Sequence, residues 1–142
     1  MPNKDLHTLI RIRKWDVDEK QREVAILMRR EEAILAAQDD LKREMAQEAE
    51  FVGQAEVIQT TFTFSAYLAR CDLRKATMAA ALIEVRRLIE EARDELAEAY
   101  RRLKTFEVTQ EQRDAAEEIE LNRLDTIELD EIGLNLHRRA AL

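Results

Sequence analysis

The sequence contains few residues whose types and spacing could do chemistry. His7 and His137 lie near opposite ends of the chain. Neither has the Glu-x-x-His spacing of di-metal bundles or the His-Glu-x-x-His spacing of zinc proteases. Cys71 is the single cysteine, which excludes an internal disulfide and a cysteine-based metal site. A lone cysteine is typical of a reducing compartment, so we expect a cytoplasmic protein.

The carboxylates and glycines form no recognisable active site either. The acidic pairs Glu117/Glu118 and Asp130/Glu131 lack the spacing of a calcium loop, and a helical rod offers them no concave pocket. The two glycines stand far apart and cannot build a phosphate-binding loop. We therefore predict no catalytic residue, no metal and no cofactor, and a protein that is not an enzyme.

The charge pattern argues against a nucleic-acid partner. The chain has 23 Lys and Arg against 30 Asp and Glu, a net charge of −7, whereas nucleic-acid binding needs a basic footprint. Acidic residues interrupt the basic run that holds Arg11, Arg13 and Lys14. The N-terminal end is basic and residues 107–131 are strongly acidic, so the two ends could attract each other or bind partners of opposite sign. No apolar run is long enough for membrane insertion.

Composition points to long helices. The 142 residues include two glycines and one proline, and 37% of the residues are charged. A sandwich or a doubly wound domain needs many turns, which require Gly and Pro. We predict an all-α protein, a single coiled-coil domain over residues 1–142 in which two long helices form an antiparallel coiled-coil hairpin.

Heptad periodicity gives the first helix, over about residues 5–53. Apolar residues recur at the a and d positions for about six heptads. The a positions are Ile10, Val17, Val24, Glu31, Gln38, Met45 and Val52, and the d positions are Leu6, Arg13, Lys20, Leu27, Ile34, Leu41 and Glu48. Trp15 lies beside this seam, where it either packs against the second helix or anchors a partner.

The pattern stops near Gly53, and a dense run of Thr and Phe predicts a turn over about residues 54–64. A second seam then predicts a helix over about residues 65–138. Its a positions are Leu68, Lys75, Leu82, Ile89, Leu96 and Leu103, and its d positions are Cys71, Met78, Val85, Ala92, Ala99 and Phe106. With the turn centred near residue 58, residue i of the first helix should lie near residue 116 − i of the second.

This pairing runs out near residue 111, so the second helix extends beyond the first. The seam positions become polar there, and apolar residues then return at helical spacing. They are Leu121, Leu124, Ile127, Ile132, Leu134 and Leu136. Because these residues have no partner left in the chain, we expect residues 118–142 to dock into a partner. Self-association and a folded-back tail are the alternatives.

Both ends of the chain resemble the FliJ family of flagellar type III export proteins, which is related to the YscO-like stalk proteins of virulence injectisomes. The stretch 6–15 followed by Asp18-Glu19 is similar to the family's opening. The tail motif is Asn122-Arg123-Leu124-Asp125, then Leu129-Asp130-Glu131-Ile132, then Arg138-Arg139-Ala140.

The resemblance implies the central stalk of a hexameric export ATPase, which promotes ring assembly and ATP hydrolysis. It also implies contact with the cytoplasmic domain of the export gate and escort of export chaperones, at the membrane periphery. The ATPase-facing candidates that it gives are Arg11, Arg13, Asn122, Arg123, Leu124, Asp125, Asp130 and Glu131.

The resemblance places the gate-binding surface on the first turns of the second helix, near Tyr67, Cys71 and Met78. Cys71 and Met78 are also seam positions, and a seam residue cannot at the same time be an exposed contact. Only one of these two interpretations can hold.

Two alternatives stay open at this point. The first is the equivalent stalk of a virulence injectisome, since the physical task is the same. The second is a coiled-coil scaffold or chaperone without an ATPase partner. The long seam also allows a homodimer, including one that exchanges helices through the turn.

Overall fold

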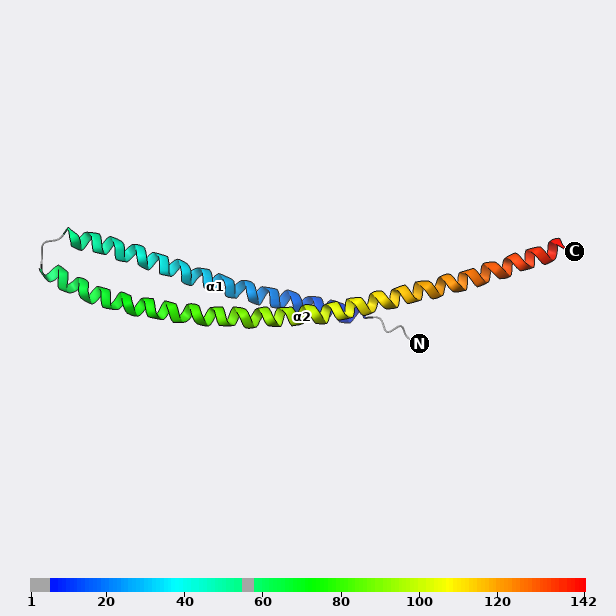
Figure 1. Ribbon diagram of the computed structural model, residues 1–142, viewed down its shortest axis with the longest axis horizontal. Helices are drawn as coiled ribbons and strands as arrows, with labels where there is room; N and C mark the ends of the chain where they lie inside the picture. The colour runs from blue at the N-terminus through cyan, green and yellow to red at the C-terminus, as the bar shows by residue number, and fades with distance from the viewer. Residues whose placement is uncertain (1–5, 55–57) are drawn as a thin grey trace. The chain divides into compact units, whose positions relative to one another are not determined.

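Two helices account for almost all of the described chain. The computed structural model describes residues 6–54 and 58–142, in which α1 spans His7–Gly53 and α2 spans Ile58–Ala140 (Figure 1). The described residues contain no strand. The two helices pack antiparallel and α2 is the longer, which confirms the all-α hairpin that the two seams predict.

The second helix begins earlier than the sequence pattern indicates. It starts at Ile58, inside the segment that we expected to be a turn, and residues 55–57 lie outside the described chain. The helix-propensity cost of a Thr or Phe is below about 1 kcal/mol, so tertiary packing can override it. A contact within the helix adds to this, since the ring of Phe64 stacks on that of Tyr67 one turn later, with ring centroids 6.1 Å apart.

The described chain divides into two compact units, which we treat separately. The hairpin unit is Val17–Glu98, and the terminal unit is Met1–Asp16 with Ala99–Leu142. In the hairpin unit the core is a single seam between the helices. Its buried residues are Val17 and Leu41 from α1 and Cys71, Val85, Ile89 and Ala92 from α2.

The heptad assignment is confirmed along both helices. Every described a and d position that we assigned is buried or half-buried except Glu48 and Lys75, whose side chains extend into solvent. The polar seam residues are tolerated because their charged ends reach the edge of the seam. Lys20 pairs with Glu95 at 3.1 Å, and Glu31 accepts a hydrogen bond from Arg86 at 3.2 Å.

Contacts between the helices fix the register. In the hairpin unit, Arg74 also pairs with Glu44 at 3.1 Å. The residue numbers of these three pairs add to between 115 and 118, close to the predicted 116. The turn position and the seam period were therefore sufficient to align the two helices.

The terminal unit has the same kind of packing at the start of α1. Ala99 and Leu103 are buried, and the Leu6 backbone N–H donates a hydrogen bond to Oε1 of Gln110 at 3.0 Å. The guanidinium carbon of Arg13 lies 5.6 Å from the ring centroid of Phe106, a cation–π contact. Trp15 is 62% exposed, so it does not pack into the seam.

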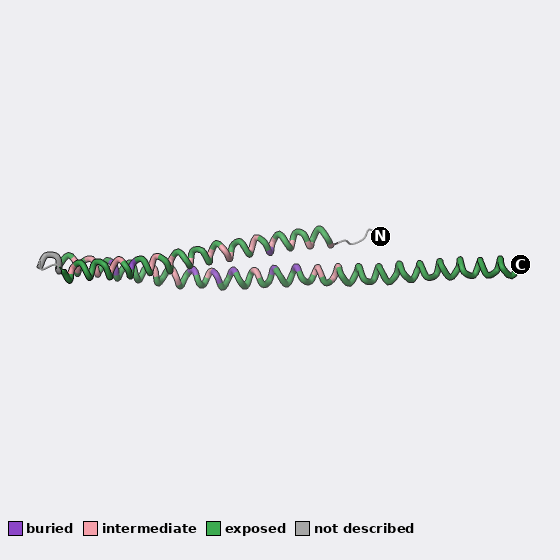
Figure 2. The backbone as a smooth tube through the Cα atoms, turned by 90° about the horizontal axis from the view of Figure 1, so that it is seen from above, coloured by how far each residue is buried: buried purple, intermediate pink, exposed green. Residues whose placement is uncertain are grey.

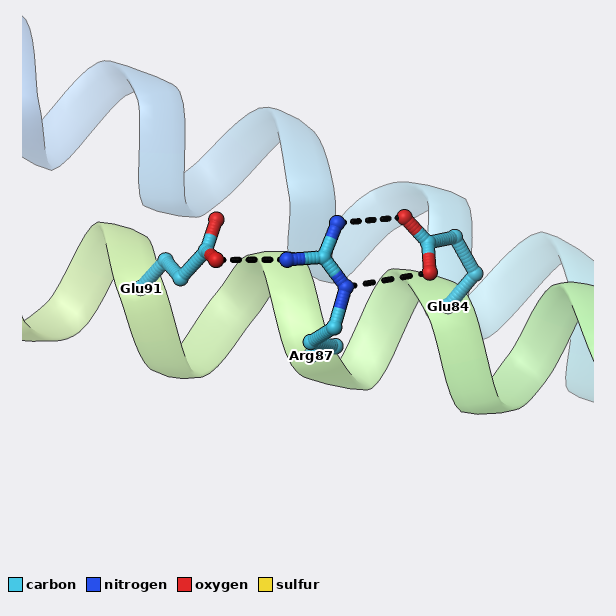
Figure 3. A network of polar contacts seen from close by, with 3 residues as sticks. All are labelled: Glu84, Arg87 and Glu91. Atoms are coloured by element: carbon cyan, nitrogen blue, oxygen red, sulfur yellow. Dashed lines mark hydrogen bonds and ion pairs between the residues drawn. The ribbon is translucent and has the colours of Figure 1, made fainter.

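The outer face of α2, opposite the seam, is charged over residues 84–98. Arg87 donates hydrogen bonds to Glu84, one turn before it, and to Glu91, one turn after it (Figure 3). The hydrogen bond from Arg87 lowers the pKa of the Glu84 carboxyl. Such pairs mildly stabilise an exposed helix face.

Candidate partner-binding surface

The most exposed part of the described chain is the last third of α2. We call residues 111–140 the tail, and every residue in it is exposed (Figure 2). Large aliphatic side chains in the tail are between 44% and 70% exposed. They are Ile119, Leu121, Leu124, Ile127, Leu129, Ile132, Leu134 and Leu136. A helix that leaves so much apolar surface uncovered is suited to binding another surface.

The apolar residues of the tail do not form the single stripe that we expected. At about 100° of rotation per residue, Leu124, Ile127 and Leu134 share the face that continues the seam. Leu121, Ile132 and Leu136 are the other members of the expected stripe. All three point away from that face, and Ile132 and Leu136 do so by more than a third of a turn. The later members of the set follow one another at steps of five and two residues, which do not keep to one face of a helix, so the sequence already contained this division.

The predicted ATPase-facing block surrounds the tail instead of lining one side. Asn122, Arg123, Leu124 and Asp125 are consecutive, so their side chains leave the helix at about 100° intervals. A flat partner touches residues three or four apart. The whole block can contact only a partner that encloses the helix.

One ion pair organises this block. Arg123 donates two hydrogen bonds to Glu120, at 2.7 Å and 3.1 Å. These hydrogen bonds lower the pKa of the Glu120 carboxyl and raise the pKa of Arg123. The Thr126 hydroxyl donates to the backbone carbonyl of Asn122 at 2.9 Å, as Thr commonly does inside a helix. The side chains of Asp125, Asp130 and Glu131 form no hydrogen bond or ion pair with another described residue.

The structure does not bring the two groups of candidate residues together. Arg11 is exposed on α1, and Arg13 lies over Phe106. Asn122 is sixteen residues farther along α2 than Phe106, or roughly 24 Å at 1.5 Å per residue. A single partner surface that contacts Arg11 and the tail motif must therefore be long.

The expected gate-binding residues lie on the packed side of α2. Tyr67, Cys71 and Met78 share one face, but Cys71 is 1% exposed and belongs to the seam. Cys71 is therefore a seam residue and not an exposed contact for the export gate. Met78 is half-buried and lines a shallow cleft between the helices together with Leu41, Lys42 and Lys75. Only Tyr67 and Met78 have surface left for a partner while the helices stay packed.

Tyr67 carries an unsatisfied polar group. Its hydroxyl is buried and has no hydrogen-bond partner among the described residues. Burial raises the pKa of this phenol, and the neighbouring Cys71 and Glu44 raise it further. Buried hydroxyls are normally hydrogen-bonded, so the burial of this hydroxyl is energetically unfavourable.

The sequence pattern missed two features that the register could have revealed. Arg13 and Phe106 are both d positions, and their numbers place them at nearly the same level of the hairpin. Lys42 and Lys75 flank one cleft for the same reason. Both features can be predicted when each residue of the first helix is matched with the residue opposite it in the second.

The fold and this surface define a class of protein. It is a two-helix antiparallel hairpin whose second helix continues as an exposed, unpaired extension. Among residues 6–54 and 58–142, no group of His, Cys, Asp and Glu could hold a metal ion. Within the same ranges, no helix is both long and apolar enough to cross a membrane.

The family follows from a comparison with known proteins. The family model described as "Flagellar FliJ protein" matches residues 3–142, nearly the whole chain. The chain therefore belongs to the FliJ family, and it is a flagellar export-associated protein. No curated protein and no solved structure matches it.

Proposed function

We propose that this protein is the central stalk of the hexameric flagellar export ATPase. In this role it promotes ring assembly and ATP hydrolysis and links them to the cytoplasmic domain of the export gate, at the periphery of the membrane export apparatus. Escort of export chaperones belongs to the same proposal. The observation that carries it is the exposed tail, in a chain of the FliJ family.

The geometry of the tail favours a partner that surrounds it. Residues 122–125 project in all directions, and apolar residues leave the helix on more than one face. The central opening of a ring is a surface of that kind. Coupling requires the stalk to bind one subunit conformation better than another, and an asymmetric helix in a symmetric ring supplies that difference.

The test is ATP hydrolysis by the cognate flagellar export ATPase, titrated with this protein. We expect a several-fold stimulation that saturates near one stalk per hexamer. The informative variant exchanges two charges in the tail, Arg123→Asp with Asp125→Arg, and we expect it to lose the stimulation while circular dichroism stays unchanged.

A matched control makes the same exchange elsewhere. Arg43 and Asp40 form an exposed ion pair on α1, far from the tail in sequence. The variant Arg43→Asp with Asp40→Arg has the same net charge and should stimulate normally. Full stimulation by the tail variant would refute the assignment of that site. Failure of the wild-type protein to stimulate an active flagellar ATPase would favour the injectisome ATPase or a scaffold role.

A further inference from the structure

The outer face of α2 changes character along its length. Alternate steps of three and four residues trace the line opposite the seam. From Glu84 to Arg101 this line is entirely charged, at Glu84, Arg87, Glu91, Asp94, Glu98 and Arg101. From Thr105 onward it carries no charge. We call this uncharged set the outer stripe: Thr105, Val108, Gln112, Ala115, Ile119, Asn122, Thr126, Leu129, Gly133, Leu136 and Ala140.

An uncharged line on this face calls for a physical reason. Charged residues make up 37% of the chain, and the outward face of an exposed helix is where they are expected. Every residue of the outer stripe is exposed, including Ile119 at 70%, Leu129 at 67% and Leu136 at 60%. Its steps have the 3.5-residue period of a left-handed coiled-coil seam.

Gly133 supports the same interpretation. It lies inside α2, where glycine costs roughly 0.5 to 1 kcal/mol relative to alanine. A Cβ added at Gly133 would meet nothing within 4 Å, so nothing in the described chain requires a glycine there. Close approach of another helix is the usual reason for a glycine or alanine at such a position.

We propose that the outer stripe is a second seam, which binds the same stripe of a second copy of this chain in the antiparallel direction. The two-fold axis passes near Ile127 and Glu128. Ile119 then packs with Leu136 of the second copy, and Thr126 packs with Leu129 of the second copy. Asn122 faces Gly133 of the second copy, where the missing side chain leaves room.

The charges beside the stripe select this orientation. Glu118 and Arg139 flank one edge of it, and Arg123 and Asp130 flank the other. In the antiparallel pair, Glu118 meets Arg139 of the second copy and Arg123 meets Asp130 of the second copy. In a parallel pair in register, each residue of one edge instead meets the residue five positions later on the other edge of the partner, so Glu118 meets Arg123 but Asp125 meets Asp130, two like charges. An antiparallel pair is also a closed two-fold dimer, which stops at two copies.

This contact uses a face of the tail about 150° from the one that continues the seam, where Leu124, Ile127 and Leu134 lie. It does not rest on the proposed ATPase role, and the two can be tested apart. Sedimentation equilibrium of the full chain over a range of concentrations measures the dimer. We expect a reversible monomer and dimer equilibrium that weakens as salt is added.

Charge variants test the pairing. Glu118→Arg with Asp130→Arg makes both edges basic, and Arg123→Glu with Arg139→Glu makes both edges acidic. Each variant alone should raise the dimer dissociation constant at least about tenfold, because attractive pairs become repulsive. An equimolar mixture of the two should recover the wild-type affinity. As a matched control, Leu124→Glu changes the opposite face and should leave the dimer unchanged.

Cysteine variants test the direction. Neither Ile119→Cys alone nor Leu136→Cys alone should form a dimer disulfide under mild oxidation, whereas the mixture of the two should. The native Cys71 does not compete, since it is buried at 1% exposure. A wild-type chain that stays monomeric at every concentration would overturn the proposal, and so would disulfides in either single variant.

Discussion

Truncation of one buried and one exposed leucine separates the hairpin from the tail. Leu41 is 1% exposed in the seam, whereas Leu124 is 49% exposed on the tail. Leu41→Ala removes about three buried methylene equivalents at about 0.8 kcal/mol each, and the cavity adds to this loss. We expect Leu41→Ala to lower the free energy of unfolding by about 3 kcal/mol. Leu124→Ala should change it by less than about 0.5 kcal/mol, because the side chain packs against nothing in the chain.

Urea denaturation followed by circular dichroism at 222 nm measures both changes, and ATPase stimulation is measured on the same samples. The expected pattern is reciprocal. Leu41→Ala should keep its stimulation as long as the hairpin is folded, whereas Leu124→Ala should lose much of its stimulation at nearly unchanged stability. If Leu124→Ala proved as destabilising as Leu41→Ala, the tail would be packed in the isolated protein. The tail would then not be free to bind a partner.

Two further predictions concern single groups. Tyr67→Phe removes a buried hydroxyl that has no partner, so the urea midpoint should stay the same or rise; a clear fall would reveal a hydrogen bond to Glu44 or Cys71. The Glu120–Arg123 pair should support the tail helix only while Glu120 is ionised. Its pKa in the folded chain is lowered from about 4.3, so the support is complete above that value and is lost as the pH falls through the lowered pKa. The tail amide-exchange difference between wild type and Glu120→Gln should therefore shrink as the pH falls, and a difference that stays constant or grows on acidification would contradict this.

The sequence by itself determined the two helices and their alignment. A 3.5-residue apolar repeat is a local signal, and two such repeats around one break leave a single way to pair them. The rule that residue i lies near residue 116 − i follows from the position of the break. Contacts as far apart as Lys20 with Glu95 and Leu6 with Gln110 obey it. The polar seam positions beyond Gln110 likewise showed in advance where α2 continues without α1.

Packing decided what the repeat could not. The start of α2 at Ile58 lies inside the expected turn, because the helix-propensity cost of Thr and Phe is too small to fix where a long helix begins. The assignment of Cys71 to the seam depends on α1 covering it, and the place of Arg13 over Phe106 depends on two residues that are distant in sequence. The faces of the tail depend on α2 remaining one uninterrupted helix, since only then does each residue have a fixed direction around the axis. The spacing of apolar residues along the sequence predicts which face of each helix is buried. Which residue each side chain contacts depends on how the two helices pack against each other.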